Sequence, residues 1–169
     1  RHGWRLMTAV PGHVTTHAKS LFMVREAGRQ LGSFHFAFRN FKGTIRRPHP
    51  MFRYDRILRQ LRIHAKVLLS DNDKRVRDSA AFLLQNFPKL FLPNGLKLKL
   101  IHTDPKISNF IFDDFGRAVA MIDLDTIQRL SPLYDLGDAL RSFCGLEEDA
   151  LGNRFDMRKY KNFLAGYRK

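Results

Sequence analysis

The hydrophobic pattern of the chain changes its period near residue 97, and this change limits the folds that the chain can adopt. Before it, apolar residues recur at three- and four-residue steps, as in Leu21, Val24 and Leu31, which is typical of helices with one buried face. After it, "LKLKLIH" (residues 96–102) alternates apolar and basic residues, as a half-buried strand does. The sequence therefore predicts an α+β fold that is mostly α, with a small sheet among the helices.

Helical periodicity marks five segments, and chain breakers separate them. Pro48 and Pro50 interrupt regular structure after the first segment, and Pro88 closes the third. The stretch "SDNDK" before the third segment offers capping side chains for its start. We expect helices over residues 17–41, 57–67, 76–86, 134–143 and 157–167, and a short strand over residues 3–10.

A β-hairpin is predicted within "SNFIFDDFGRAVAMIDLD". Phe110–Phe112 and Ala118–Ile122 read as its strands, and Asp113–Gly116 as the turn between them. The two ends of a hairpin lie close together. Asn109 and Asp123, which flank the hairpin, are therefore expected to be neighbours.

Four polar residues, His102, Asp104, Lys106 and Asn109, stand between the alternating strand and the hairpin. The oxygen atoms of Asn109 and Asp123 suit Mg²⁺, which proteins commonly hold with one or two ligands plus substrate phosphates. Asp104 remains able to accept a proton from an attacking hydroxyl, and Lys106 to neutralise charge on a phosphoryl group. This set of residues predicts phosphoryl transfer, in which positioning and electrostatics do most of the catalytic work.

The charge of the chain allows a second interpretation. Thirty Lys and Arg against sixteen Asp and Glu give a formal net charge of +14, which would suit nucleic acid or another polyanion. The basic residues are dispersed and form no nucleic-acid motif, so we rank nucleic-acid binding behind catalysis. The alternative hypothesis is a non-catalytic module that uses its basic surface to bind nucleic acid or an anionic partner. The single cysteine, Cys144, and the lack of a long apolar run predict a cytoplasmic protein without a membrane partner.

The stretch "HTDPKISN" followed by "MIDLDT" resembles the catalytic loop and metal-binding segment of the protein-kinase-like superfamily. It resembles in particular the aminoglycoside phosphotransferase and choline-kinase branch, in which the metal aspartate has an Ile-Asp-x-Asp context. "GRQLGSFHFAF" and "SPLYDLGDALR" are similar to segments of small-molecule kinases of the N-acetylhexosamine 1-kinase type. The resemblance runs from Trp4 to Tyr167.

This resemblance implies an ATP-dependent kinase that phosphorylates a small hydroxylated acceptor, a sugar or amino sugar, with Mg²⁺ as cofactor. It implies that Asp104 is the base, that Asn109 and Asp123 bind the metal, and that His102 holds the loop in shape. Lys106 would lie near the γ-phosphate or the acceptor. Weaker candidates for the substrate or for support of the metal are Asp125, Asp138 and Arg141.

The stretch "RLMTAVPG" resembles the hinge that follows the nucleotide-binding lobe of such kinases. Backbone groups around Thr8 and Val10 would bind the adenine, and Ile111 and Ile122 would form its apolar floor. The family also implies an amino-terminal lobe with a glycine-rich strand pair, a strand lysine and a helix glutamate. No segment here resembles that lobe.

We therefore expect residues 1–12 to be a remnant of the hinge strand and residues 13–169 to be the carboxy-terminal lobe. The missing lobe would be the main partner of this chain, and the chain alone would be weakly active or inactive. Simpler roles compete for some residues. Asp135 is expected to cap the last-but-one helix, His35 to be a satisfied core residue, and Arg141 could be a surface ion-pair residue.

Overall fold

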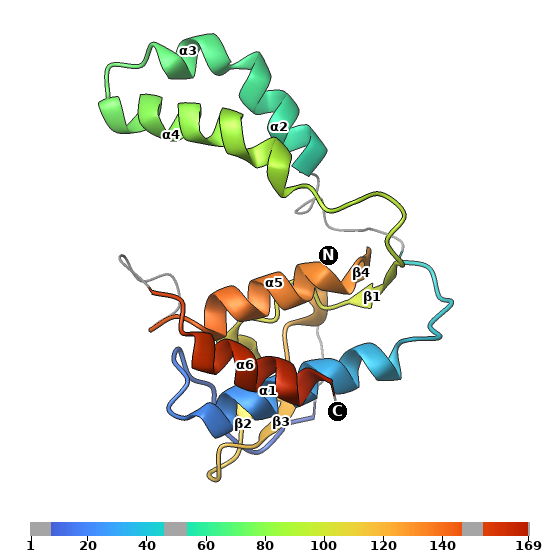
Figure 1. Ribbon diagram of the computed structural model, residues 1–169. Coiled ribbons are helices and arrows are strands. Elements are labelled where there is room, and N and C mark those ends of the chain that lie inside the picture. Colours follow the sequence, from blue (N-terminus) through green and yellow to red (C-terminus); the bar gives the residue numbers. More distant parts are fainter. Residues whose placement is uncertain (1–7, 46–53, 147–153, 169) are drawn as a thin grey trace, which may run out of the picture. The chain divides into compact units, whose positions relative to one another are not determined.

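The computed structural model describes residues 8–45, 54–146 and 154–168. Helices dominate these residues and small antiparallel strand pairs lie among them, so the predicted mostly helical α+β class is confirmed (Figure 1). The chain divides into two compact units. One joins Arg1–Pro48 to Lys97–Lys169, and the other is the intervening His49–Leu96.

Helix α1 (Leu21–Ala37) is the longest helix described in the first unit and is shorter at both ends than the predicted 17–41. It starts where Ser20 caps it, because the Ser20 side chain accepts a hydrogen bond from Met23 N at 3.2 Å. Its buried face follows the three- and four-residue spacing and contains Met23, Val24, Ala27, Gly28, Leu31 and His35.

Helix α6 (Met157–Tyr167) begins and ends where the sequence predicted and packs along α1 (Figure 1). The two backbones touch. A Cβ atom built on Gly32 would lie 2.5 Å from Tyr167 O, and one on Gly28 would collide with Phe163 O. Gly166 approaches Arg25 O in the same way from the other helix. Glycine is the residue that permits this close packing.

The predicted hairpin is present as β2 (Phe110–Phe112) and β3 (Ala118–Met121), paired antiparallel. Asp113 closes its turn by accepting hydrogen bonds from Phe115 N at 3.0 Å and Arg117 N at 2.9 Å. Gly116 takes the left-handed conformation that the turn requires (φ 78°).

A second strand pair joins β1 (Lys99–Ile101) to β4 (Gln128–Leu130). The sequence predicted β1, within residues 96–102, but did not predict β4. The three-residue segment "QRL" is too short to show an alternating pattern. The paired residues of the two strands lie 27 to 31 positions apart in the sequence, so only the fold brings the strands together.

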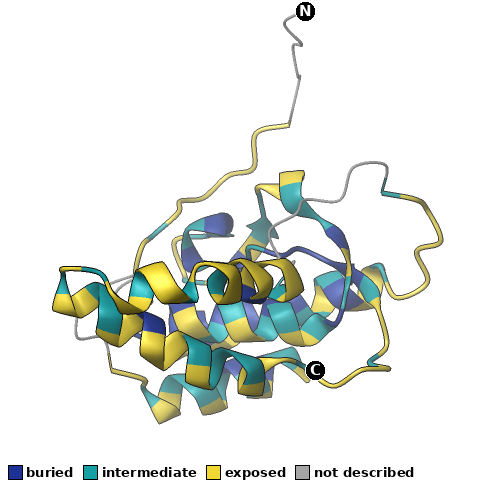
Figure 2. Cartoon of the chain, turned by 90° about the horizontal axis from the view of Figure 1, so that it is seen from above, coloured by how far each residue is buried: buried dark blue, intermediate teal, exposed yellow. Residues whose placement is uncertain are grey.

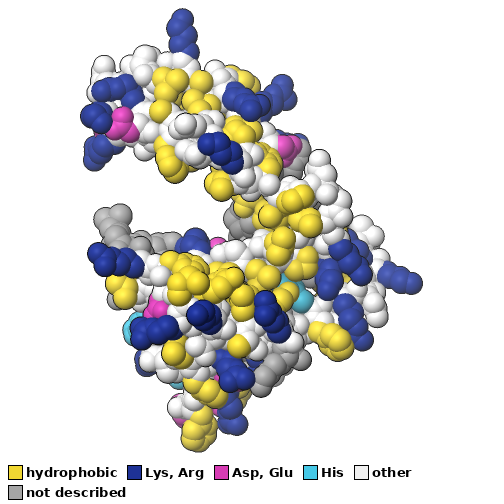
Figure 3. Space-filling model, in the orientation of Figure 1, with side chains coloured by type: hydrophobic (Ala, Val, Ile, Leu, Met, Phe, Trp, Pro, Cys, Tyr) yellow, Lys and Arg dark blue, Asp and Glu magenta, His cyan; other side chains and the backbone are white. Residues whose placement is uncertain are grey.

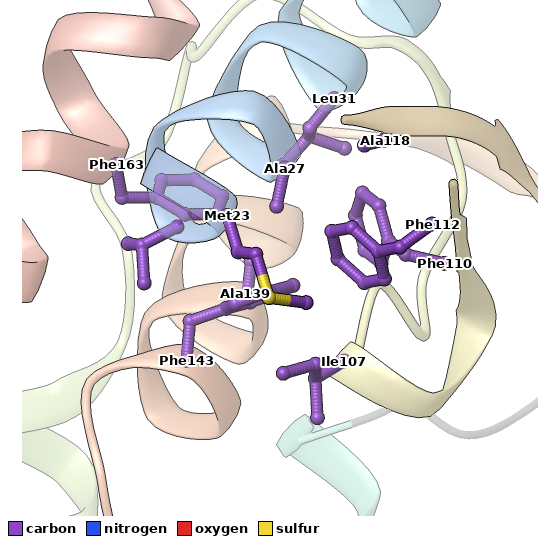
Figure 4. Packing of buried hydrophobic residues seen from close by; sticks show 11 residues of the cluster. Met23, Ala27, Leu31, Ile107, Phe110, Phe112, Ala118, Ala139, Phe143 and Phe163 are labelled. Atoms are coloured by element: carbon purple, nitrogen blue, oxygen red, sulfur yellow. The ribbon is translucent and has the colours of Figure 1, made fainter. Parts of the chain in front are cut away.

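The core of the first unit lies between α1, α6, the hairpin and helix α5 (Pro132–Phe143). Figure 4 shows the rings of Phe110 and Phe112 pointing from the hairpin toward α1, with Phe143 and Phe163 on the neighbouring helices. Phe110 and Phe143 meet edge to face, with ring centroids 5.2 Å apart. Burial in Figure 2 follows these elements, whose inner faces are buried and whose outer faces are exposed.

The second unit consists of α2 (Tyr54–Ile63), α3 (Ala65–Leu69), α4 (Lys74–Asn86) and a 3₁₀ turn (Phe87–Leu90). The prediction of one helix over residues 57–67 is wrong, because the helix breaks at His64 (φ −92°, ψ 3°). Neither glycine nor proline marks this break. The start of α4 follows the capping signal, since Asp73 accepts from Arg75 N at 2.8 Å.

Two further predictions concern the amino-terminal strand and membrane-spanning segments. Gly3 to Met7 of the predicted strand lie outside the described residues, and residues 8–10 are not in a strand. Among the described helices, none combines the length and hydropathy required to cross a bilayer.

Candidate active site

Three of the predicted site residues meet in the loop between β1 and β2. Lys106 Nζ lies 3.2 Å from Asp104 Oδ2. Asn109 Nδ2 donates to the same carboxylate oxygen at 3.0 Å and to the Asp104 backbone carbonyl at 2.8 Å. Asn109 is 6% exposed, whereas Asp104 is half-buried.

Local sequence explains why these residues converge. Pro105 restricts the backbone after Asp104, and the 3₁₀ turn Ile107–Asn109 then reverses the chain. Asn109 N donates to Lys106 O at 2.9 Å, and the fully buried Ile107 anchors the turn in the core. The turn therefore places the Asn109 amide over Asp104.

His102 connects this loop to the far end of the hairpin. Its Nε2 lies 2.9 Å from Ile122 O, and its Nδ1 accepts from Asp104 N at 3.3 Å. These partners fix the neutral tautomer with hydrogen on Nε2, because a carbonyl oxygen can only accept. Both ring nitrogens are used within the protein and the residue is fully buried, so His102 connects the loop to the hairpin, and its role in shaping the loop stays a prediction.

Asp123 directly follows this junction. Ile122 N donates a hydrogen bond to Asn109 O at 2.9 Å. This bond joins the neighbour of Asp123 to Asn109, the other predicted metal ligand. Asp123 itself is exposed and has a left-handed backbone (φ 64°, ψ 60°). Such a conformation costs a non-glycine residue about 1 kcal/mol and is concentrated at functional sites. The approach of the Asn109 and Asp123 side chains stays a prediction.

The turn after Asp123 is also bonded to the loop. Thr103 Oγ1 donates to Thr126 O at 2.8 Å, and Thr126 Oγ1 donates to His102 O at 3.3 Å. Asp125 lies on this 3₁₀ turn (Leu124–Thr126) and is exposed. Thr103, like Asp123, has a positive φ (76°), so a left-handed residue stands on each of the two bonded segments.

Asp135 is bonded to the loop in a way that sequence reasoning missed. The prediction that it caps a helix is wrong: Ser131 is the N-cap of α5, and Asp135 lies inside the helix and is fully buried. Its Oδ2 accepts from His102 N at 2.8 Å and its Oδ1 from Thr103 N at 2.7 Å. The pair Ser131-Pro132 is a helix-start signal, and it would have placed Asp135 one turn inside.

A second pair of residues extends this connection into the core. His35 Nε2 lies 2.8 Å from Asp135 Oδ2, and His35 Nδ1 lies 2.8 Å from the Tyr167 hydroxyl. Both nitrogens of His35 are satisfied and the residue is 3% exposed, so the prediction of a satisfied core histidine is confirmed. Burial raises the pKa of the Tyr167 hydroxyl, and the Asp135 charge adds to the rise. One hydrogen-bond network thus joins α1, α5 and α6, and Asp135 on α5 connects it to the loop.

Asp138 and Arg141 lie on the next turn of α5. They form an ion pair of 3.1 Å, and Arg141 is half-exposed. Burial raises the pKa of Asp138, the Arg141 guanidinium opposes the rise, and the charges of Asp104 and Asp135 add to it. Asp138 is therefore close enough to Asp104 for the two carboxylates to interact. Its Oδ2 is buried without a hydrogen-bond partner among the described residues.

Two of the residues predicted to contact a nucleotide, Thr8 and Val10, precede the first helix. Thr8 and Val10 are exposed and outside regular structure, and Val10 is 41% exposed. The segment that follows reaches the hairpin: His13 and Phe112 exchange two backbone hydrogen bonds, of 2.8 and 2.9 Å.

The two predicted floor residues, Ile111 and Ile122, are both half-buried on the hairpin. Gly12 has a positive φ (133°), and a Cβ atom there would lie 2.6 Å from Ile111 Cγ2. Ile111 is therefore in direct contact with the predicted hinge segment.

The metal-binding capacity of the site rests on few ligands. Among the residues that the structure describes, no group of three or more His, Cys, Asp or Glu side chains is arranged to hold a metal ion. Asn109 and Asp123 supply one amide and one carboxylate. That donor set fits a hard cation such as Mg²⁺, which takes much of its coordination from water and substrate phosphates.

Comparison with known proteins identifies the family. Two solved structures match 95% of this chain, with TM-scores of 0.58 and 0.56. The first, 17% identical, is an amicoumacin kinase in complex with AMP-PNP, Ca²⁺ and Ami; the second, 20% identical, is an aminoglycoside-3'-phosphotransferase of type VIII. The chain spans 47% and 64% of their lengths, respectively.

These similarities show a partial protein-kinase-like fold. A model of the phosphotransferase enzyme family matches residues 1–168, which is nearly the whole chain. The family predicted from "HTDPKISN" and "MIDLDT" is thus confirmed. The chain belongs to the phosphotransferase enzyme family.

Proposed function

We propose that this chain carries the catalytic half of an ATP-dependent phosphotransferase, which transfers the γ-phosphoryl group of ATP to a hydroxyl of a small acceptor of the sugar or amino sugar class. The observation that carries the proposal is the contact of Asp104 with both Lys106 and Asn109. This trio lies on a loop whose hydrogen bonds reach the residue next to Asp123.

Each residue of the trio has a chemical role in this reaction. The oxygen of the acceptor hydroxyl attacks the γ-phosphorus of ATP, and its proton passes to the Asp104 carboxylate. The bond between the γ-phosphorus and the bridging oxygen breaks, and ADP leaves with that electron pair. Asn109 orients the carboxylate through its Nδ2. Lys106 supplies positive charge beside Asp104, where the transferring group must pass.

Asn109 Oδ1 and the Asp123 carboxylate would hold Mg²⁺. The hydrogen bonds to Asp104 use the amide nitrogen of Asn109, which leaves the amide oxygen as its cation ligand. When bound, the metal supplies positive charge to the phosphates of ATP. The amicoumacin kinase, a structural relative, was solved with a nucleotide analogue and a divalent cation, which supports this pairing of cofactors.

The remaining candidates would contact either the nucleotide or the acceptor and metal. Backbone groups near Thr8 and Val10 would bind the adenine, with Ile111 and Ile122 beneath it, and the contact of Gly12 with Ile111 supports this arrangement. Asp125, Asp138 and Arg141 would contact the acceptor or support the metal site.

The rest of the ATP site would come from a nucleotide-binding lobe. Without it we expect residues 1–169 to have weak activity or none. We propose a cytoplasmic setting; the single cysteine, Cys144, is buried, and burial raises its pKa to about 11, so it stays a thiol.

The test is Asp104→Asn in the intact protein that carries this chain. ADP release would be followed with ATP, Mg²⁺ and a panel of sugars and amino sugars. A general base contributes about 10²- to 10⁴-fold, so kcat should fall by that factor while the melting temperature stays close to that of the wild type.

The matched control is Asp114→Asn, on the exposed hairpin turn, which should leave kcat unchanged. Chelation with EDTA should abolish turnover of the wild type, and added Mg²⁺ should restore it. Turnover of Asp104→Asn at near the wild-type rate would refute the assignment of the base.

A further inference from the structure

A cavity of about 390 Å³ lies beside β4 and outside the residues assigned to catalysis. It belongs to the first unit and is formed by the segment after α1 and by the start of β4. Its lining residues are Lys42, Gly43, Thr44, Ile45, Gln128 and Arg129.

The polar side chains around this cavity are rich in hydrogen-bond donors. Lys42 and Arg129 are cationic, Thr44 offers a hydroxyl, and no described lining residue is acidic. Arg129 is held in place, because its guanidinium donates to Phe41 O and lies over the Phe41 ring with its Cζ 5.9 Å from the centroid. Lys42 is exposed and can adjust to a ligand.

Gln128 adds an unsatisfied donor to this set. It is 7% exposed, and its Nε2 has no hydrogen-bond partner among the described residues. A buried amide without a partner is costly, and native proteins contain few of them. Its position is fixed by the fold, since Gln128 pairs with Ile101 across the β1–β4 ladder. Nε2 itself is buried, so a ligand that brings acceptor oxygens would satisfy this amide once the Gln128 side chain turns toward the cavity.

The cavity is linked through the backbone to the catalytic loop. Gln128 stands two positions after Thr126, whose carbonyl accepts from Thr103 Oγ1 at 2.8 Å. Strand β1, the partner of β4, runs directly into His102. A molecule bound beside Gln128 is therefore held by the same sheet that positions the loop.

We propose that this cavity binds an anionic oxygen group, a carboxylate or a phosphate, of the acceptor. The inference rests on the proposed function and narrows its substrate class. Four donor-bearing side chains, with no acidic residue among the described lining residues, suit an oxyanion and oppose a polycationic acceptor. The formal net charge of +14 acts in the same direction.

Binding can be tested without turnover. Inorganic phosphate and glucuronate would be titrated into the protein, with the side-chain amide resonances of Gln128 as the NMR probe and calorimetry for Kd. Gln128→Met and Lys42→Gln should each raise Kd about tenfold or more, because each removes a hydrogen bond to a charged group. Lys161→Gln removes the same charge from an exposed site on α6 and should leave Kd within about twofold.

Gln128→Met separates a binding role from a structural one. Because it replaces an unsatisfied amide by an apolar group of similar shape, the melting temperature should stay the same or rise while anion affinity falls. An equal loss of affinity in Lys161→Gln would show that only overall charge attracts anions and would overturn the proposal. So would displacement of phosphate by AMP-PNP, which would assign the cavity to the nucleotide.

Kinetics then connect the cavity to the acceptor. Glucose and glucuronate, or glucose and glucose 6-phosphate, differ by the anionic group. The wild type should favour the anionic member of each pair, and Gln128→Met should raise its KM about tenfold while leaving the KM for ATP unchanged.

Asp104→Asn distinguishes the proposed base from the proposed anion site, because it should lower kcat by about 10²- to 10⁴-fold and keep phosphate binding. Loss of phosphate binding with normal turnover in Gln128→Met would overturn the acceptor role of the cavity and leave the catalytic assignment intact.

Discussion

At the scale of single residues, the candidate site depends on one carboxylate, Asp135, that lies outside the catalytic loop. Asp135 receives two backbone N–H groups of the loop and contacts His35 from α1, which lies 100 positions away in the sequence. The motif residues of the loop could be predicted because they lie within eight positions of one another. The contact with His35 could not be predicted, because it depends on how three helices pack.

Asp135→Ala should lower the free energy of unfolding by about 3–5 kcal/mol, because it leaves buried polar groups of His102, Thr103 and His35 without a partner. Urea denaturation measures this loss. The control Asp114→Ala removes an exposed carboxylate on the hairpin turn and should change stability by no more than about 0.5 kcal/mol. Equal stability of the two variants would show that the loop keeps its conformation without Asp135.

At the scale of elements, the sequence predicted segments whose signals are local. Helix α6 has an Asp156 cap and a clear apolar period, and its predicted bounds agree with the structure. The hairpin agrees as well, since Asp113 and Gly116 mark its turn. Strand β4 and the break at His64 have no local signal, so their formation depends on tertiary contacts that a single sequence does not reveal.

Substitution by alanine should change stability in opposite directions at two glycines, of which one lies in the contact of α1 with α6 and the other does not. Gly28→Ala should destabilise the protein by about 1–3 kcal/mol, because its Cβ atom would collide with the backbone of Phe163 and push the helices apart. Gly137 lies on the exposed face of α5, with nothing within 4 Å of a built Cβ atom. Gly137→Ala should therefore stabilise the protein by about 0.5–1 kcal/mol through helix propensity.

Chemical denaturation of the two variants gives both values, and circular dichroism checks that the helix content is retained. Destabilisation of the same size at both positions would mean that backbone flexibility, and not the contact between the helices, determines the effect at Gly28.

At the scale of the whole molecule, the two units differ in how much apolar surface they bury. The first has the phenylalanine-rich core of Figure 4. In the second, the buried hydrophobic residues among those described are Leu58 and Ala80, while Ile63, Val67 and Leu90 are largely exposed. Lys and Arg side chains are spread over both units on the face seen in Figure 3, where Asp and Glu are sparse. Like charges of this density add repulsion to the thinly packed second unit.

Hydrogen exchange should therefore separate the two units. Amides of α2–α4 should exchange faster than those of α1 and α6, because regions with few buried apolar contacts open at a smaller free-energy cost than a packed core. Mass spectrometry of peptic fragments measures both groups in one sample. Raising the salt concentration should slow exchange in the second unit by screening its repulsion, with a smaller effect on α1 and α6. Uniform protection across all five helices would instead mean that the chain unfolds as one cooperative body.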